Sequence, residues 1–510
     1  MQRAETAGFL TRQPLFLLFL GCAALSMYLP AAHALVRDDH PTSQSFFYAG
    51  TLGLFLFVML AIVMSSRRSK RGLVGQLMAL MAALVVLPAY LAVPFHDALG
   101  TTRFINAYVE MVSALTTTGA TLFSNPDRLN DTLHLWRAQV GWMGGFMMWV
   151  AASAILAPLS LGGFEVTAMG APGRGDSAQV AAERAEPGRR LMRITRTLAP
   201  IYAGLTGVLW LALLLAGDRP LVALCHAMSV MATSGISPVG GLENSGGGFA
   251  GEAAMALFML FALSRLTFSG DTMTKGSARL DRDPEFRIGL LIVVAVPALL
   301  FLRHWFGAYD LDGANSLGAA LRALWGSLFT VLSFLTTTGF ASAEWDTARD
   351  WSGLGTPGVL LMGLAIIGGG VATTAGGVKL LRVYALYLNG LREMERLVHP
   401  SSVGSEAGRS ARIKRDGAFI AWVFFMIFAL TLAAFTVIFA FQGLQFEDAM
   451  LLTVAALTTT GPLMDVAAET PINLLEIDTA AKLTFSVAMV LGRLETLAFI
   501  ALLSARFWRA

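Results

Sequence analysis

Charge is scarce in this sequence. Asp, Glu, Lys and Arg make up 14% of its 510 residues, against about 25% in an ordinary soluble domain. The formal net charge is only +3, and the basic residues stand in short loops rather than in a patch with interleaved aromatic residues, which argues against a nucleic-acid partner. Hydrophobic residues reach 55% and the mean hydropathy is +0.63. This balance excludes a soluble globular protein of the usual kind.

Cysteine and clustered histidine are also lacking. Cys22 and Cys225 lie far apart in apolar stretches, without metal-ligand or redox spacing, so we expect both to be small core residues. The seven histidines are scattered singly and give no support to a zinc site. A membrane-embedded enzyme such as an intramembrane protease is a remote alternative, because its one near match, Ser269-Gly270-Asp271, has no second motif. We expect a protein that is not an enzyme and has no covalently bound cofactor.

Long apolar runs, by contrast, recur along the whole chain. A helix needs roughly 20 apolar residues to cross the hydrocarbon core of a bilayer. The candidate crossings are residues 13–35, 46–65, 73–95, 138–161, 196–216, 252–269, 287–303, 356–389, 416–440 and 479–505. The sequence therefore predicts an all-α integral membrane protein with about ten transmembrane helices.

The basic residues predict the orientation of these helices. They cluster in alternate loops, at residues 67–71, 174–196, 282–287 and 392–415, and the positive-inside rule places these loops and both termini in the cytoplasm. The first apolar run ends in Ala32-His33-Ala34, which resembles a signal-peptide cleavage site. The loop charges alternate regularly only if that helix is kept, so we expect it to be retained in a multi-pass protein of a bacterial inner membrane.

One phrase of threonine and glycine occurs four times, at residues 113–120, 231–236, 333–340 and 456–462. A single copy is an ordinary helix end, since glycine supplies the left-handed residue past the C-cap. Four copies at near-constant spacing, each between a short apolar run and a full crossing, predict four repeats of helix, re-entrant pore half-helix, turn and helix. Two crossings per repeat give all four the same orientation, which disfavours an inverted-repeat transporter.

The predicted organisation follows from these repeats. An N-terminal helix pair (1–72) precedes four pseudo-symmetric pore repeats (73–165, 195–286, 287–395 and 396–510), with a cytoplasmic loop at 166–194. The four turns are expected to converge on one axis.

Convergence of the turns predicts a cation selectivity filter. A ring of backbone carbonyls replaces the water around a monovalent cation, and glycine lets the carbonyls turn inward. The half-helix C-termini add partial negative charge, and the phrases lack the acidic ring that would favour divalent ions. The predicted filter residues are Thr116, Thr117, Thr118, Gly119, Thr233, Ser234, Gly235, Thr336, Thr337, Thr338, Gly339, Thr458, Thr459, Thr460 and Gly461. The predicted K⁺ ligands are the backbone carbonyls of Thr116, Thr117, Thr233, Ser234, Thr336, Thr337, Thr458 and Thr459.

A glycine-rich break and several charges inside the membrane complete the candidate residues. Residues 368–377 hold five glycines, each of which disfavours a helix by about 0.5–1 kcal/mol, so we expect a break; the alternative is a close contact between helices. Arg493, near mid-membrane, either faces the cavity below the filter or pairs with Glu495. Glu110 and Asp448 are expected to stabilise half-helix N-termini.

The residues singled out around this break are Gly368, Gly369, Gly370, Thr373, Thr374, Gly376, Gly377, Lys379 and Arg493. Lys379 either anchors the loop or reaches the cytoplasmic interface.

With these residues the sequence resembles the Trk/Ktr/HKT superfamily of K⁺ transport proteins, most closely its TrkH/TrkG-like pore-forming branch. The matching stretches are Glu110–Ser113 before the first phrase, Arg282–Arg287, Gly368–Lys379 and Gly492–Glu495. The resemblance implies K⁺ as the transported ion, preferred over Na⁺ because Gly119 stands at the first filter position. It also implies that residues 368–377 form an intramembrane gate, that the protein is a homodimer, and that a TrkA-like cytoplasmic ring binding NAD, ATP or ADP regulates it.

Three features depart from the family's pattern. Ser234 and Ile236 stand where Gly and Phe are common, Leu463-Met464 stands where Gly-Leu is common, and the 171–186 loop is atypical. They leave open a Na⁺-selective protein, or a Na⁺- or H⁺-coupled K⁺ transporter, of the same fold.

Overall fold

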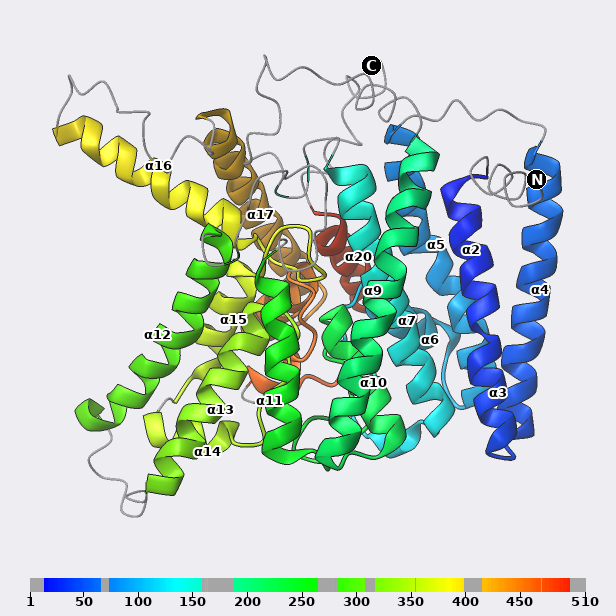
Figure 1. The fold of residues 1–510 in the computed structure, drawn as a ribbon, viewed down its shortest axis with the longest axis horizontal. Coiled ribbons are helices and arrows are strands. Elements are labelled where there is room, and N and C mark those ends of the chain that lie inside the picture. The colour runs from blue at the N-terminus through cyan, green and yellow to red at the C-terminus, as the bar shows by residue number, and fades with distance from the viewer. Residues whose placement is uncertain are drawn as a thin grey trace.

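The computed structural model describes residues 13–65, 73–157, 161, 163, 187–264, 280, 283–307, 317–353, 355–398, 415–468 and 470–495. In these ranges every regular element is a helix, and Figure 1 shows the helices standing side by side in one layer-like bundle. The predicted all-α integral membrane fold is confirmed. Several predicted features lie outside the described residues, among them the basic residues 67–71, Ser269-Gly270-Asp271, Arg282, the 171–186 loop and residues 496–505.

The N-terminal helices are α2 (Leu15–Ser26), α3 (Tyr28–Val36) and α4 (His40–Ser65), which lie at one end of the bundle (Figure 1). Together α2 and α3 form one candidate span, and α4 forms the next. They are held to the rest by contacts such as the 2.8 Å hydrogen bond from Gln139 Nε2 to the Ser26 carbonyl. Cys22 is exposed on α2, so the expectation that it is a core residue was wrong; Cys225 is buried as expected.

The remaining helices follow in four groups. The first holds α5 (Leu73–Leu99), α6 (Phe104–Leu115) and α7 (Asp131–Ala151), and the second holds α9 (Pro187–Ala216), α10 (Pro220–Ala232) and α11 (Gly248–Met259). The third holds α12 (Pro284–Gly307), α13 (Leu317–Leu335), α14 (Trp345–Ser352), α15 (Pro357–Ile367) and α16 (Leu380–Val398). The fourth holds α17 (Arg415–Phe441), α18 (Phe446–Leu457), α19 (Leu463–Val466) and α20 (Thr479–Leu494).

Eight described helices are long and apolar enough to cross a membrane, or nine if the bent pair α14 and α15 counts as one span. Two of the ten predicted crossings, 252–269 and 479–505, continue into residues outside the described ranges, so the count in the described residues is lower. The run 252–269 is helical only over 248–263 in the described residues, and the run 356–389 is interrupted between α15 and α16. One of the eight is α13, which was predicted as a pore half-helix. Its first residues, from Leu317, are exposed and make the helix long enough to span, and its buried residues begin at Ala323.

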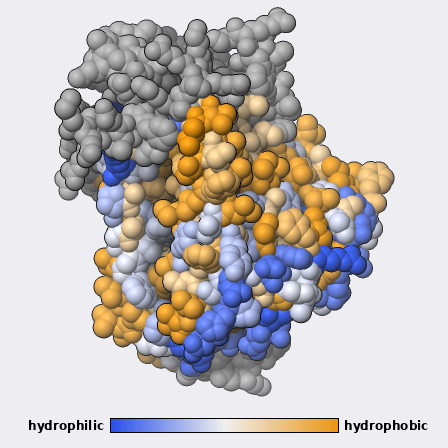
Figure 2. Space-filling view, turned by 90° about the vertical axis from the view of Figure 1, so that its right-hand side faces the viewer, coloured by the Kyte–Doolittle hydropathy of each residue, from blue (hydrophilic) through white to orange (hydrophobic). Residues whose placement is uncertain are grey.

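The packing order of the groups is cyclic. Within each group the helix that leads into the Thr-Gly phrase (α6, α10, α13 or α18) packs against both of its flanking helices. Between groups α7 packs on α10, α11 on α13, α15 on α18, and α20 on α6. The last group therefore closes on the first. The face drawn in Figure 2 carries hydrophobic side chains over much of its area, with hydrophilic ones gathered toward its lower end, as expected of a surface in contact with lipid.

Candidate functional site

The four Thr-Gly turns follow the C-termini of α6, α10, α13 and α18, and they touch one another in the same cyclic order. A Cβ atom placed on the glycine of one turn would meet the next turn. Such a Cβ on Gly119 would lie 1.6 Å from the Ser234 carbonyl oxygen, and one on Gly235 would lie 2.4 Å from that of Thr338. A Cβ on Gly339 would lie 2.9 Å from Pro462 Cγ, and one on Gly461 would lie 2.1 Å from the Ala120 amide nitrogen. The Gly461 N–H also donates a 2.6 Å hydrogen bond to the Thr118 carbonyl. The turns therefore form a closed ring.

The turns share one backbone path. The residue two before each glycine has a positive φ, a conformation that β-branched residues rarely adopt. These residues are Thr117, Thr233, Thr337 and Thr459, with φ of 55°, 50°, 56° and 54°. Such a residue costs about 1–3 kcal/mol and persists only where its surroundings enforce it. The shared path also aligns the four turns residue by residue. In the second turn Ala232 is equivalent to Thr116 and Thr233 to Thr117, whereas the sequence prediction named the carbonyls of Thr233 and Ser234.

Threonine hydroxyls in the turns are bonded back to the protein. The Thr116 hydroxyl donates to the Val112 carbonyl at 2.7 Å and lies 2.8 Å from the Thr118 hydroxyl. The third and fourth turns repeat this arrangement. The second turn has alanine at the first position, and its Ser234 hydroxyl pairs instead with that of Ser229, at 3.1 Å. In the first, third and fourth turns the hydroxyls on either side of the positive-φ threonine are thus bonded to each other.

Most of the backbone carbonyls predicted to bind K⁺ have no hydrogen-bond donor among the described residues. Of the eight named from the sequence, only that of Thr458 accepts a hydrogen bond from the described residues, a 3.3 Å bond from the Thr460 hydroxyl. No donor in the described part of the chain reaches the carbonyls of Thr116, Thr117, Thr233, Ser234, Thr336, Thr337 and Thr459. All seven residues are at most 1% exposed. Buried carbonyls are almost always paired, so this ring offers oxygens to a dehydrated cation.

Glu110 anchors the chain that leaves the first turn. It lies in the middle of α6 and not in its first turn, so it does not stabilise the helix N-terminus as expected; Asp448 does lie in the first turn of α18. The Glu110 carboxylate accepts from the Leu122 N–H at 2.8 Å and pairs with Arg137 of α7 at 2.6 Å. Both charged side chains are nearly fully buried. Leu122 comes three residues after Gly119, so the pair fixes where the turn exits.

A second buried carboxylate, Glu252 of α11, anchors the third turn from the neighbouring group. Its two oxygens accept from the Ala343 N–H, the Ser342 hydroxyl and the Trp325 indole N–H, each at 2.7 Å. Ser342 comes three residues after Gly339, the same offset as Leu122 in the first turn. Sequence reasoning missed Glu252 because its partners lie about ninety residues away and no local spacing points to them.

We expect Glu252→Ala to lower the free energy of unfolding by about 3–5 kcal/mol, because it leaves three buried donors without an acceptor. Thermal unfolding of the purified protein in detergent measures the effect. Glu243→Ala is the matched control, since Glu243 is an exposed glutamate in the same group of helices. Equal unfolding temperatures for the two variants would show that Glu252 is not an anchor.

The glycine-rich segment between α15 and α16 is a loop whose two ends are bonded together. The Val378 N–H donates to the Ile366 carbonyl and the Lys379 N–H to that of Ile367, both at 2.9 Å. Gly368 needs its positive φ of 74°, and a Cβ there would lie 2.2 Å from the Gly376 carbonyl oxygen. The break expected from the glycines is therefore a tight excursion of the chain rather than a contact between two continuous helices.

The tip of this loop lies directly against the ring. The Gly376 N–H donates to the Thr337 hydroxyl at 2.7 Å, and a Cβ on Gly376 would lie 2.1 Å from the Thr458 carbonyl oxygen. The Thr374 hydroxyl donates to the Met231 carbonyl, at the end of α10, at 3.3 Å. The loop therefore contacts three of the four half-helix ends.

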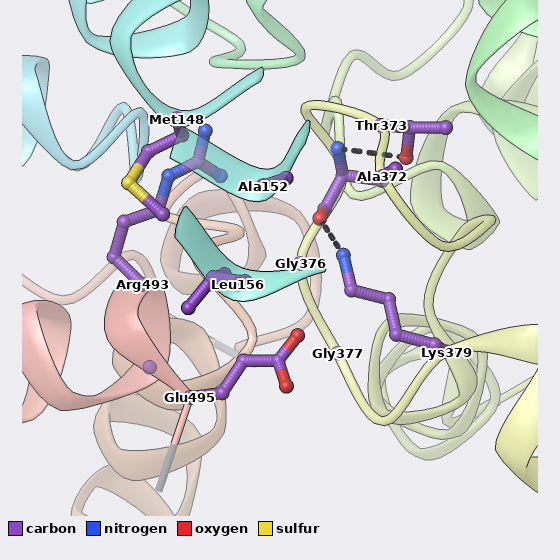
Figure 3. Close-up of a pocket in the computed structure, with 12 residues that line it drawn as sticks. Met148, Ala152, Leu156, Ala372, Thr373, Gly376, Gly377, Lys379, Arg493 and Glu495 are labelled. Carbon is purple, nitrogen blue, oxygen red and sulfur yellow. Dashed lines mark hydrogen bonds between the residues drawn. The ribbon is translucent and has the colours of Figure 1, made fainter. Parts of the chain in front are cut away.

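Arg493 and Lys379 approach the loop from opposite sides of a small cavity beside it (Figure 3). The Arg493 Nη1 donates to the Thr374 carbonyl at 2.6 Å, and its Nε and Nη2 have no partner among the described residues. The Lys379 ammonium donates to the Ala375 carbonyl. Both side chains are 6% exposed. Arg493 thus faces the cavity instead of pairing with Glu495, and Lys379 bonds to the loop instead of reaching the cytoplasmic interface.

Glu495 has a different partner, which sequence reasoning missed. Its carboxylate accepts from Arg382 of α16 at 2.6 Å, and the same guanidinium lies 3.7 Å from the centre of the Phe424 ring. Arg382 also donates to the Val378 carbonyl at the end of the loop and is fully buried. This arginine therefore ties the end of α20 to the base of the loop.

Comparisons with known proteins agree with these features. A family model described as TrkH, cation transport protein, matches residues 85–509. The Trk system potassium uptake protein TrkH of Salmonella typhimurium is 31% identical over 97% of each chain, and TrkG of Escherichia coli is 28% identical over 80% of this chain and 79% of that one. The crystal structure of the potassium transporter TrkH from Vibrio parahaemolyticus superposes with a TM-score of 0.80 at 26% identity, covering 98% of this chain and 100% of that one.

Proposed function

We propose that this chain, which belongs to the TrkH family of cation transport proteins, takes up K⁺ across a bacterial inner membrane through its ring of turns. The class predicted from the sequence, a multi-pass cation transport protein and not an enzyme, is that of the family. The observation that carries the proposal is a set of six buried carbonyls at equivalent positions of the turns that have no donor among the described residues, those of Thr116, Thr117, Thr233, Thr336, Thr337 and Thr459. Curated relatives named as potassium uptake proteins support K⁺ as the ion.

The ring has the chemistry that K⁺ selectivity requires. A partly dehydrated monovalent cation is bound by carbonyl dipoles that are strong enough to replace water and weak enough to release the ion. The C-termini of α6, α10, α13 and α18 each contribute roughly half a negative charge near the turns. We assign the filter to the four turns, with the second turn using Ala232 and Thr233 where the first uses Thr116 and Thr117. The Ala232 carbonyl accepts a 2.8 Å hydrogen bond from the Thr233 hydroxyl, as the Thr458 carbonyl does from that of Thr460.

The loop between Gly368 and Lys379 is assigned as the gate. Its hydrogen bond to Thr337 places backbone atoms directly beside the ring, where they obstruct an ion leaving it. Arg493 adds a positive charge to the adjoining cavity, which raises the energy of a cation there. Movement of the loop is needed for flux, and Arg493 and Lys379 hold it in the obstructing position.

The wider assembly is part of the same proposal. The relatives' names place them in a Trk system, which supports a separate regulatory component. We assign that role to a TrkA-like cytoplasmic ring that binds NAD, ATP or ADP, acting on a homodimer of this chain with cytoplasmic termini. The helices α2, α3 and α4, between Leu15 and Ser65, precede the four proposed pore repeats.

Uptake of Rb⁺ and K⁺ into proteoliposomes tests the function. We expect saturable uptake of both ions driven by their gradients, with Na⁺ as a weak competitor at equal concentration. Competition by Na⁺ equal to that by K⁺ would favour the Na⁺-selective alternative. A strict requirement for a Na⁺ or proton gradient would favour a coupled transporter, and absence of flux in folded protein would contradict the proposal.

A further inference from the structure

The four helices that lead into the turns share one position, nine residues before the glycine of each turn. Its occupants are Glu110 in α6, His226 in α10, Thr330 in α13 and Leu452 in α18. All four residues are at most 1% exposed. We call this the anchor position. The helices therefore bury the same position beside each turn, and only the chemistry of its side chain differs from group to group.

In the first and third turns the anchor position binds the chain that leaves the turn. Glu110 accepts from the Leu122 N–H at 2.8 Å, and the Thr330 hydroxyl accepts from the Ser342 N–H at 3.2 Å. Both donors come three residues after the glycine of their turn. At that offset the second turn has Pro238, which has no N–H to donate. An anchor of the same kind is therefore impossible in the second turn.

His226 binds the second turn through Ser237 instead, one residue before this proline. Its Nε2 lies 3.0 Å from the Ser237 hydroxyl oxygen. That oxygen is the centre of the chain leaving the turn, because it accepts from the Val239 N–H at 3.2 Å and from the Gly241 N–H at 3.1 Å. A single contact to His226 therefore holds the whole exit of the second turn.

The hydrogen bonds of Ser237 assign the protonation of the histidine ring. A hydroxyl has one proton and two lone pairs, and the two backbone N–H groups occupy both lone pairs. The proton has two acceptors within reach, His226 Nε2 at 3.0 Å and the Gly241 carbonyl at 3.3 Å. The shorter contact assigns it to His226, whose ring is then neutral, with Nε2 as the acceptor and the hydrogen on Nδ1.

His226 also contacts the third turn. Its ring meets that of Phe340, the first residue after the third turn's glycine, edge to face with ring centres 5.5 Å apart. The two turns also approach each other directly, since a Cβ on Gly235 would lie 2.4 Å from the Thr338 carbonyl oxygen. The second turn lacks the pair of bonded hydroxyls that the other three have. Its position beside the third turn therefore depends on the side chain at the anchor position.

We propose that His226 is a specificity-determining positioning residue. It holds Ser237 and contacts Phe340, and it thereby sets the spacing of the second and third turns and the ratio in which the ring passes Na⁺ and K⁺. The contact with Ser237 stands on geometry alone. The effect on the ion ratio rests on the proposed function, because it assumes that the ring is the filter.

Competition of Na⁺ against Rb⁺ uptake into proteoliposomes tests the effect on specificity. In His226→Gln the amide oxygen reaches about as far as Nε2 and keeps an acceptor for Ser237, whereas in His226→Asn it reaches only as far as Nδ1. We expect His226→Asn to raise the Na⁺ to Rb⁺ ratio several-fold and His226→Gln to stay close to the wild type. His40→Asn is the control, since His40 is an exposed histidine at the start of α4, and it leaves the ratio unchanged.

Ser237→Ala removes the other partner of the same contact and keeps the test valid if His226→Asn folds poorly. We expect it to raise the ratio as well, and the double variant to show no further rise, because both changes remove one interaction. A purely structural role would lower the yield of folded protein and the total uptake without changing the ratio. An unchanged ratio in folded His226→Asn and Ser237→Ala proteins, or a His226→Gln protein as altered as His226→Asn, overturns the role in specificity.

Solid-state NMR of the full-length protein in lipid bilayers tests the contact independently of flux. The protein carries isotope-labelled histidine, and the signal lost in His226→Gln identifies the ring. We expect a neutral ring with the hydrogen on Nδ1, and a hydrogen on Nε2 overturns the assigned contact. If the wild-type protein carries no flux, the proposed function has failed, while the NMR result still decides the contact.

Discussion

Gly119→Ser should raise Na⁺ permeation relative to K⁺ more than any other single change at the ring. A Cβ at this position would lie 1.6 Å from the Ser234 carbonyl oxygen, and the φ of +72° disfavours any side chain. The two turns must move apart, which displaces carbonyls of both. A selectivity change of tenfold corresponds to about 1.4 kcal/mol, so a small displacement of carbonyls is enough to produce it.

Competition of Na⁺ against Rb⁺ uptake measures this ratio. Gly100→Ser is the matched control, because Gly100 has a similar φ of +62° but a Cβ placed on it would meet no atom within 4 Å. The control therefore carries the backbone strain without the clash. An unchanged Na⁺ to Rb⁺ ratio in folded Gly119→Ser protein would exclude the ring as the filter.

Arg493→Gln is expected to increase flux in the absence of any regulatory partner by several-fold. The change removes the positive charge from the cavity and replaces the strong bond to the Thr374 carbonyl by a neutral one, so both the barrier to cations and the hold on the loop weaken. Arg493→Lys keeps the charge and is expected to show a smaller increase, which separates the two contributions.

Rb⁺ efflux from loaded proteoliposomes measures this basal flux. Arg303→Gln serves as the control, since Arg303 is an exposed arginine near the end of α12. Loss of flux in folded Arg493→Gln protein would mean that the arginine assists conduction instead of restraining it.

The features that could be predicted from the sequence are those encoded by short local patterns of residues. The turns were recognisable because threonine and glycine repeat in sequence, and the break after α15 because glycines cluster in an apolar run. Four equivalent phrases also implied a ring, which the contacts from Gly119 to Ser234 and from Gly461 to Thr118 now describe. These features depend on backbone conformation, which short stretches of sequence encode.

Features that depend on distant partners were not predictable. Glu495 stands two residues from Arg493 in the sequence, yet its partner is Arg382, 113 residues away. Glu252 reaches the exit of the third turn from another group of helices. The register of the second turn was also ambiguous, because alanine at position 232 hides its equivalence to Thr116 until the φ values are compared. Pairs of side chains that are distant in the sequence form because helices pack together, and no repeating pattern in the sequence indicates them.

The bond that closes the ring, from Gly461 to Thr118, joins the last group of helices to the first. A ribosome makes the chain from its N-terminus, and domains generally form as their residues emerge. Three groups can therefore form before the fourth exists, and the ring of turns is closed only when the last group, which also carries Arg493, has been made.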